Sequence, residues 1–190
     1  MHFPASAPKK SKITSMTQIA LFVAFMAICA WITIPGVIPF TLQIFAVFLA
    51  LDLLGGKKGT LAILLYLFLG GIGLPVFHGF RGGFSVFFEA TGGYLLGFIV
   101  LGLTHAGLSV FLPEKRRFRY LASLLGLMTC YLFGSFWFYR LYLSAGTPLS
   151  YASVLQISVI PFLIPDLCKL FLAISLGNRI RKLAPGLFAQ

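Results

Sequence analysis

Long apolar segments with almost no charged residues constrain the fold of this chain more than any other feature of its sequence. Five such segments are present, at 13–51, 59–80, 90–113, 120–139 and 154–177. Only the last of them contains charged residues, and it contains two. Charged residues make up only 10% of the chain, whereas about 25% is usual for a soluble domain. Since helices satisfy their own backbone hydrogen bonds in lipid, the sequence predicts an all-α integral membrane protein embedded in a bilayer. Soluble enzymes, disulfide scaffolds and disordered chains are excluded.

Six transmembrane helices are expected, because one crossing needs about 20 residues. The segment 13–51 is long enough for two crossings, and 34–39 (IPGVIP) ends one helix and permits another. The other four segments supply one crossing each. No separate soluble domain is expected. Residues 1–190 therefore form a single transmembrane domain, of which 1–12 are a basic N-terminal segment.

The basic residues predict the orientation. Twelve of the 15 Lys and Arg residues fall on one side of the predicted membrane: Lys9, Lys10, Lys12, Lys57, Lys58, Lys115, Arg116, Arg117, Arg119, Arg179, Arg181 and Lys182. Positive residues concentrate on the cytoplasmic side, so both termini are predicted to be cytoplasmic in a multi-pass protein of the cell membrane. Their position between apolar runs argues against a nucleic-acid partner, despite the formal net charge of +11.

The connection between the third and fourth predicted spans is unusual. Residues 69–94 contain eight glycines and five phenylalanines. By the orientation above this segment is extracellular. A solvated linker would be rich in Ser or Lys, so we interpret the segment as a Gly/Phe-rich lid that packs over the helices. The alternative is an aromatic collar at the membrane interface.

Asp166 and Lys169 are the most informative residues, because an ionisable side chain within a membrane span costs about 2.5–3.5 kcal/mol on insertion scales. Their i,i+3 spacing places them on one helical face, close enough to pair. Proline favours the first turn of a helix, so we expect the last helix to begin near Pro165. The pair then either holds helices together or forms the polar floor of a site for a solute entering from outside.

The other polar residues of the apolar segments and their flanks allow less specific predictions. Thr41 and Gln43 could each bind a ligand or a neighbouring helix. Glu89 could pair with Arg81. Asp52 lies near two lysines and is expected to be solvated.

Metal binding is not expected. His78 and His105 each stand alone in the sequence. The three cysteines show no metal-ligand spacing and are interpreted as small buried apolar residues: Cys29, Cys130 and Cys168.

Small residues follow one face of the first helix. Ala20, Ala24 and Ala27 recur at i, i+4 and i+7, a spacing that lets another helix approach closely. This face serves either internal packing or the docking of a partner protein.

Four segments together resemble the BioY family, the biotin-specific S components of energy-coupling factor (ECF) transporters. They are 38–43 (IPFTLQ), 65–77 (LYLFLGGIGLPVF), 91–98 (TGGYLLGF) and 164–169 (IPDLCK). The family carries Gly-Pro before Thr-Gly-Gly-Tyr, whereas this chain has Glu89 and Ala90. Either Arg81 neutralises the added carboxylate, or Glu89 faces away from the site.

The resemblance implies an S-component fold in which 1–190 is a substrate-binding domain for biotin. It implies that Asp166 and Lys169 contact the ureido ring, which has two N–H donors and a carbonyl acceptor. It further implies that the Phe-rich lid and Tyr94 cover the thiophene ring and the valeryl chain by apolar contact. The implied substrate-binding residues are Asp166, Lys169, Tyr94, Gly93, Gln43, Thr41, Phe77, Phe84 and Arg81.

The family also implies partners, namely an ECF transmembrane coupling subunit and two ATPase subunits, with Ala20, Ala24 and Ala27 as the docking face. The sequence has no GxxxxGK[ST] loop, so ATP is expected to bind only to partner subunits, and no cofactor is expected in this chain. Two alternatives are an intramembrane enzyme that uses Asp166 and Lys169, and an S component for another vitamin. The enzyme needs further catalytic groups at that depth, which the sequence does not supply.

Overall fold

The computed structural model describes residues 12–36, 38–113, 115–146, 149–184 and 186–188. Residues 1–11 of the predicted basic segment lie outside these ranges. The helices of the described residues are α1 (Lys12–Trp31), α2 (Gln43–Gly71), α3 (Gly92–Phe111), α4 (Arg116–Ser144), α5 (Tyr151–Ser158) and α6 (Ile160–Leu183). A two-stranded antiparallel hairpin, β1 (Thr33–Ile34) and β2 (Phe40–Thr41), joins α1 to α2.

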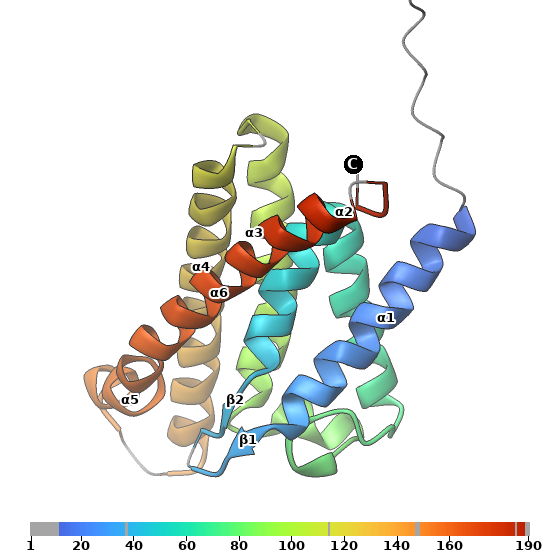
Figure 1. Cartoon of the computed structure of the whole chain (residues 1–190). Coiled ribbons are helices and arrows are strands. Elements are labelled where there is room, and N and C mark those ends of the chain that lie inside the picture. Colours follow the sequence, from blue (N-terminus) through green and yellow to red (C-terminus); the bar gives the residue numbers. More distant parts are fainter. Residues whose placement is uncertain (1–11, 37, 114, 147–148, 185, 189–190) are drawn as a thin grey trace, which may run out of the picture.

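Helix α2 contains a chain reversal and consists of two arms. Gly55 has φ 78° and ψ 166°, a conformation open to glycine but strained for other residues. The chain rises through 43–54 and returns through 56–71 (Figure 1). The arms lie in close contact, since a Cβ at Gly59 would lie 2.8 Å from the Cα of Leu51. These arms correspond to the second and third predicted spans, although the second arm ends at Gly71, before the predicted end at Phe80.

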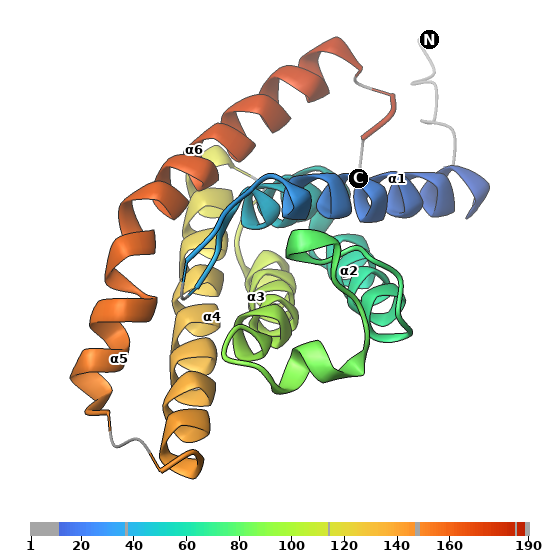
Figure 2. The same cartoon turned by 90° about the horizontal axis from the view of Figure 1, so that it is seen from below.

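The helices form two layers. Figures 1 and 2 show α1 and α6 crossing one side of a layer that contains α2, α3 and α4. Between them lies an apolar core to which every long helix contributes, including the fully buried Met26, Phe48, Leu101, Leu127 and Ile174. Many large apolar side chains face outward instead, among them Val110, Phe111, Leu132, Ile164 and Leu172. An outer surface of this kind suits lipid rather than water.

Four helices of the described part of the chain are long and apolar enough to cross a membrane, namely α1, α3, α4 and α6. The predicted sixth span is divided, because the chain turns at Val159 between α5 and α6. Helix α6 begins at Ile160, with Pro161 in its first turn, and Pro165 lies inside it. The expectation that this helix begins near Pro165 was therefore wrong, since the earlier proline takes that position.

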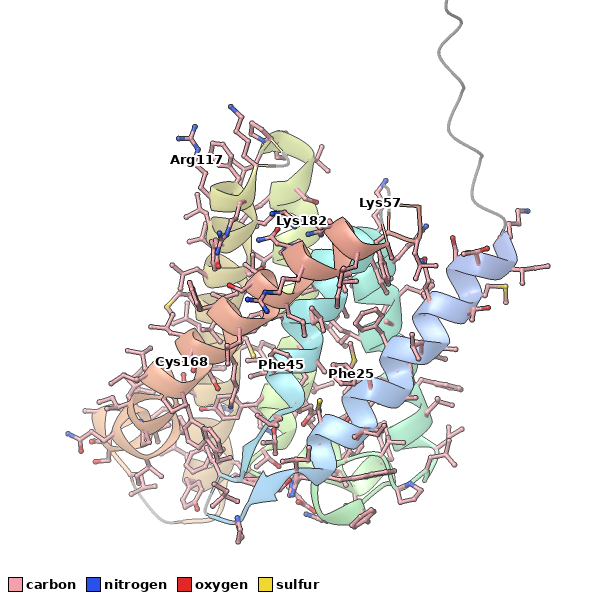
Figure 3. The ribbon with its side chains drawn as sticks, in the orientation of Figure 1. Phe25, Phe45, Lys57, Arg117, Cys168 and Lys182 are labelled. Atoms are coloured by element: carbon pink, nitrogen blue, oxygen red, sulfur yellow. The ribbon has the colours of Figure 1, made fainter. Side chains whose placement is uncertain are left out.

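The two ends of the bundle differ in charge. Lys57, Arg117 and Lys182 come from three different helices and lie together at the upper end in Figure 3, which we call the basic end. The start of α1 and the end of α6 lie toward the same end (Figure 1). The β1–β2 hairpin lies at the opposite end, which we call the hairpin end.

Residues 72–91 also lie at the hairpin end and pack against the helices. They contain two short 3-10 helices, η1 (His78–Phe80) and η2 (Phe84–Phe88). Trp31 fixes this segment to α1, because its Nε1 donates a hydrogen bond to the Pro75 carbonyl (2.9 Å) and its ring stacks on Phe80. The buried rings of Phe77 and Phe87 meet edge to face.

Candidate ligand-binding site

Asp166 and Lys169 form a buried ion pair, as their spacing predicted. The Lys169 Nζ lies 2.8 Å from the Asp166 Oδ1, and each side chain is only 7% exposed. Taking two charges out of water is costly unless their remaining hydrogen-bonding capacity is used. The surroundings of the pair therefore decide what it does.

Three groups from other elements complete the surroundings of the pair. The Tyr131 hydroxyl on α4 donates a hydrogen bond to the Asp166 Oδ2 (2.7 Å). The Lys169 Nζ donates to the backbone carbonyl of Thr41 (2.8 Å) and lies 3.8 Å from the centre of the Phe40 ring. Carbonyl and ring face are both attractive to an ammonium group. The pair is thus held between α4, α6 and β2.

The same two side chains form part of the wall of a cavity of about 80 Å³, which we call the ligand cavity. Its walls come from β2, α2, α3, α4, α5 and α6 and from residue 78. The lining residues are Ile38, Pro39, Thr41, Gln43, Ile44, His78, Thr91, Tyr94, Leu95, Phe98, Tyr131, Ser158, Phe162, Asp166 and Lys169. Apolar walls with a few convergent polar groups are typical of a small-molecule site.

Three of the predicted site residues join the pair in this wall. Gln43 is buried, and its Nε2 donates a hydrogen bond to the Tyr66 hydroxyl (2.9 Å), which in turn donates to the Val76 carbonyl. Thr41 presents its backbone to Lys169. The Tyr94 hydroxyl is buried near Ser158 and completes no hydrogen bond of ordinary geometry within the described residues. Gln43 and Thr41 thus contact both the cavity and neighbouring elements.

A second hollow, of about 550 Å³, adjoins the ligand cavity, and we call it the vestibule. The two share the lining residues Pro39, His78 and Thr91. Arg81 and Glu89 line the vestibule and form the expected ion pair, in which Arg81 Nη1 donates to Glu89 Oε2 (2.7 Å). The hydrogen bond to Glu89 raises the pKa of Arg81.

His78 links the two hollows and was not predicted as a site residue. Its Nε2 is buried without a partner among the described residues. Burial lowers the pKa of His78, so the imidazole is neutral at pH 7. A neutral imidazole can donate from one nitrogen and accept at the other.

Three predicted site residues lie outside the walls of both hollows. Gly93 packs against α4, where a Cβ would lie 2.3 Å from the Trp137 side chain. Phe77 is fully buried against Tyr66 and Phe87. Phe84 packs against Phe87 and Phe88 and is 67% exposed. In the structure all three contact neighbouring helices or loop residues, and their contacts with a ligand stay predictions.

The predicted docking face of α1 is divided. Ala20 and Ala24 are exposed, but Ala27 is buried in the core. Ala27 therefore serves internal packing, which was one of the two expected uses of this face, and only Ala20 and Ala24 are accessible to a partner. Cys168 was also expected to be buried and is exposed, whereas Cys29 and Cys130 are buried as expected.

The expectation for Asp52 was also wrong. It was expected to be solvated, but its side chain is 1% exposed and two guanidinium groups hold it. Arg119 Nη1 lies 2.8 Å from Oδ1, and Arg181 Nη1 lies 2.9 Å from Oδ2. We call these three residues the basic-end cluster. Gly177 makes room for it, since a Cβ there would lie 2.1 Å from Asp52 Oδ2.

The fold and the cavity define a helical membrane protein with a solute-binding site between its helices. The sequence profile of the BioY family matches residues 6–186, and this chain belongs to that family.

Named relatives agree with this assignment. The probable biotin transporter BioY of Pyrococcus horikoshii is 37% identical over 90% of this chain and 98% of its own length. The biotin transporter BioY of Thermotoga maritima is 41% identical over 88% of this chain and 96% of its own length. A crystal structure of the S-component for biotin from an ECF-type ABC transporter superposes with a TM-score of 0.75 at 29% identity, covering 90% of this chain and 92% of the other.

Proposed function

We propose that this chain is the biotin-binding subunit of a vitamin uptake transporter in the cell membrane. Its membership of the BioY family and the names of its relatives support this role. The relatives are transporters, so the chain is not an intramembrane enzyme. The observation that carries the proposal is the Asp166–Lys169 pair in the wall of the ligand cavity.

The chemistry of the pair matches a cyclic urea. The ureido ring of biotin has two N–H groups, which a carboxylate accepts, and one carbonyl oxygen, to which an ammonium donates. Asp166 and Lys169 supply these two groups three positions apart on one helix. Thr41, Gln43 and Tyr94 line the remaining wall and contact the bicyclic ring.

The aliphatic chain of the vitamin then extends toward the vestibule. Phe162 and Leu95 offer apolar contacts within the ligand cavity, and Arg81 offers a positive charge in the vestibule. Glu89 competes for that charge in the unliganded protein. Gly93, Phe77 and Phe84 act on the site through packing only.

The membrane topology follows from the two ends of the bundle. We infer that α1, α3, α4, α6 with α5, and the two arms of α2 make six transmembrane segments. The basic end is cytoplasmic, and both termini lie there. The segment 72–91 is then extracellular and forms the lid over the site.

The energy for uptake comes from partner subunits. The proposed partners are an ECF transmembrane coupling subunit and two ATPases, which bind the ATP. The exposed face of α1 at Ala20 and Ala24 is the proposed docking surface. Biotin binds from outside, the lid closes, and the body reorients against the coupling subunit to release the vitamin inward.

Isothermal titration of the purified chain with biotin, thiamine and riboflavin tests the proposal. We expect heat of binding with biotin at one site per chain and none with the other two vitamins. Binding of thiamine or riboflavin instead would assign the S component to another vitamin. Absence of binding to all three, in protein that elutes as a single folded species, would reject the vitamin-binding role.

A further inference from the structure

The basic-end cluster carries an excess of positive charge. Arg119 and Arg181 face a single carboxylate, Asp52, so one positive charge is not neutralised within the cluster. Arg119 also donates to the side-chain oxygen of Asn178, which adds no charge. Excess positive charge beside a low-dielectric interior attracts an anion.

A cavity of about 290 Å³ lies beside this cluster. Its lining includes Asp52, His105, Leu112, Phe118, Arg119 and Arg181. None of these residues lines the ligand cavity or the vestibule. The cavity therefore belongs to a different part of the molecule from the proposed biotin site.

Two buried groups at this cavity have unused hydrogen-bonding capacity. His105 is 3% exposed, and neither of its ring nitrogens has a partner among the described residues. The Nε of Arg119 is likewise buried without a partner there. A buried polar group without a partner destabilises the fold, so two at one cavity require a reason. A guanidinium N–H and an imidazole N–H are both donors to an acceptor-rich ligand.

The position of the cavity limits what can enter it. Leu112, Pro113 and Phe118 belong to the connection between α3 and α4 and its flanks, at the end where the basic residues gather. Phosphate groups of the inner leaflet lie at this level when the basic end is cytoplasmic. Basic pockets between membrane helices on that side bind anionic headgroups.

We propose that the cavity beside the basic-end cluster binds a phosphate-type oxyanion. The anion accepts hydrogen bonds from Arg119 and His105 and balances the excess charge of Arg119 and Arg181. A cation is repelled by the two guanidinium groups, and a neutral apolar molecule would leave the donors unsatisfied. The oxyanion is either the headgroup of an anionic phospholipid or free phosphate.

Native mass spectrometry of the full chain, with added phosphatidylglycerol or phosphatidylcholine, tests the lipid source. Thermal melting with inorganic phosphate tests the free ion. Two variants remove donors, His105→Leu and Arg119→Gln, and Arg117→Gln is the matched control. Arg117 lies on the same helix but does not line the cavity. His105→Leu keeps every ion pair of the cluster, so it remains informative if Arg119→Gln fails to fold.

We expect the wild-type chain to bind phosphatidylglycerol about tenfold more tightly than phosphatidylcholine, and His105→Leu to lose most of that preference. Arg117→Gln should retain it. If inorganic phosphate raises the melting temperature of the wild type but not of His105→Leu, and neither lipid is preferred, the site takes the free ion. Equal loss in Arg117→Gln, or no stabilisation by either anion, would overturn the proposal.

Discussion

The ammonium of Lys169 donates a hydrogen bond to the backbone carbonyl of Thr41, 128 positions away along the chain, at 2.8 Å. This contact holds β2 against α6 and fixes one wall of the ligand cavity. It also orients the ammonium before any ligand arrives. A preorganised donor loses less entropy when the ligand binds.

Substitution of Lys169 should therefore affect binding strongly. Lys169→Met keeps the unbranched side chain up to Cε but removes the donor and leaves Asp166 as an unpaired buried charge. We expect biotin affinity to fall about 10- to 100-fold, since hydrogen bonds to charged groups contribute about 1.5–3 kcal/mol. Titration calorimetry measures the loss. Lys182→Met, at the basic end, is the control and should bind like the wild type.

Asp166→Asn tests the other half of the ureido assignment. The amide replaces a charged acceptor of two N–H groups, so affinity should fall by a similar factor, about 10- to 100-fold. Tyr131→Phe removes only the hydrogen bond to Asp166 Oδ2 and should have the smaller effect. Equilibrium binding of radiolabelled biotin compares the two. Unchanged affinity in Asp166→Asn would remove the ureido assignment.

Glu89→Gln tests whether Glu89 and the carboxylate of biotin compete for Arg81 in the vestibule. The variant releases Arg81 from its ion pair, so biotin should bind a few-fold more tightly and Arg81→Gln should bind more weakly. Biotin methyl ester, which lacks the carboxylate, should not distinguish Glu89→Gln from the wild type. Titration with both ligands provides the measurement. An equal effect on acid and ester would show that the Arg81–Glu89 pair acts on lid structure rather than on the ligand carboxylate.

Ala24→Leu separates binding from uptake. The larger side chain projects from the exposed face of α1 and should hinder a partner helix without reaching the ligand cavity. We expect normal biotin binding and reduced uptake in cells that contain the coupling module. Ala152→Leu adds the same volume to the exposed surface of α5 and should affect neither. Parallel loss of binding and uptake in Ala24→Leu would make it a packing residue.

Asp52→Asn should lower stability more than any surface substitution. It leaves Arg119 and Arg181 without their common carboxylate, and breaking a buried ion pair costs roughly 3 kcal/mol. The matched control is Glu89→Gln, whose ion pair is exposed at both ends and contributes at most about 1 kcal/mol. Thermal melting of the two variants in detergent gives the comparison. A similar small shift in both would show that solvent screens the basic-end cluster.

The sequence predicted those features that depend on nearby residues. The i,i+3 spacing of Asp166 and Lys169 and the eight-residue separation of Arg81 and Glu89 both led to pairs that the structure confirms. Asp52 was misjudged because its partners lie 67 and 129 positions away, whereas the lysines beside it in sequence are near neighbours.

Nothing in the sequence indicated that Tyr131 contacts Asp166, since a tyrosine in an apolar segment cannot be told from any other buried aromatic residue. The walls of the ligand cavity could not be predicted for the same reason. They combine residues from β2, α3, α4 and α6, and only the packing of the helices decides which side chains face one another. Phe77 was predicted from its segment alone, and in the structure its ring packs against Tyr66 and Phe87 rather than in the cavity wall.

Helix α6 carries a charged contact near each of its ends. Asp166 and Lys169 lie at the ligand cavity, while Arg181 lies at the basic-end cluster, and no proline or non-helical residue separates them. At about 1.5 Å per residue, the 15 positions from Asp166 to Arg181 span about 22 Å. Because the helix is uninterrupted between these two contacts, any tilt of α6 at the ligand cavity would also displace Arg181 relative to Asp52 at the basic end.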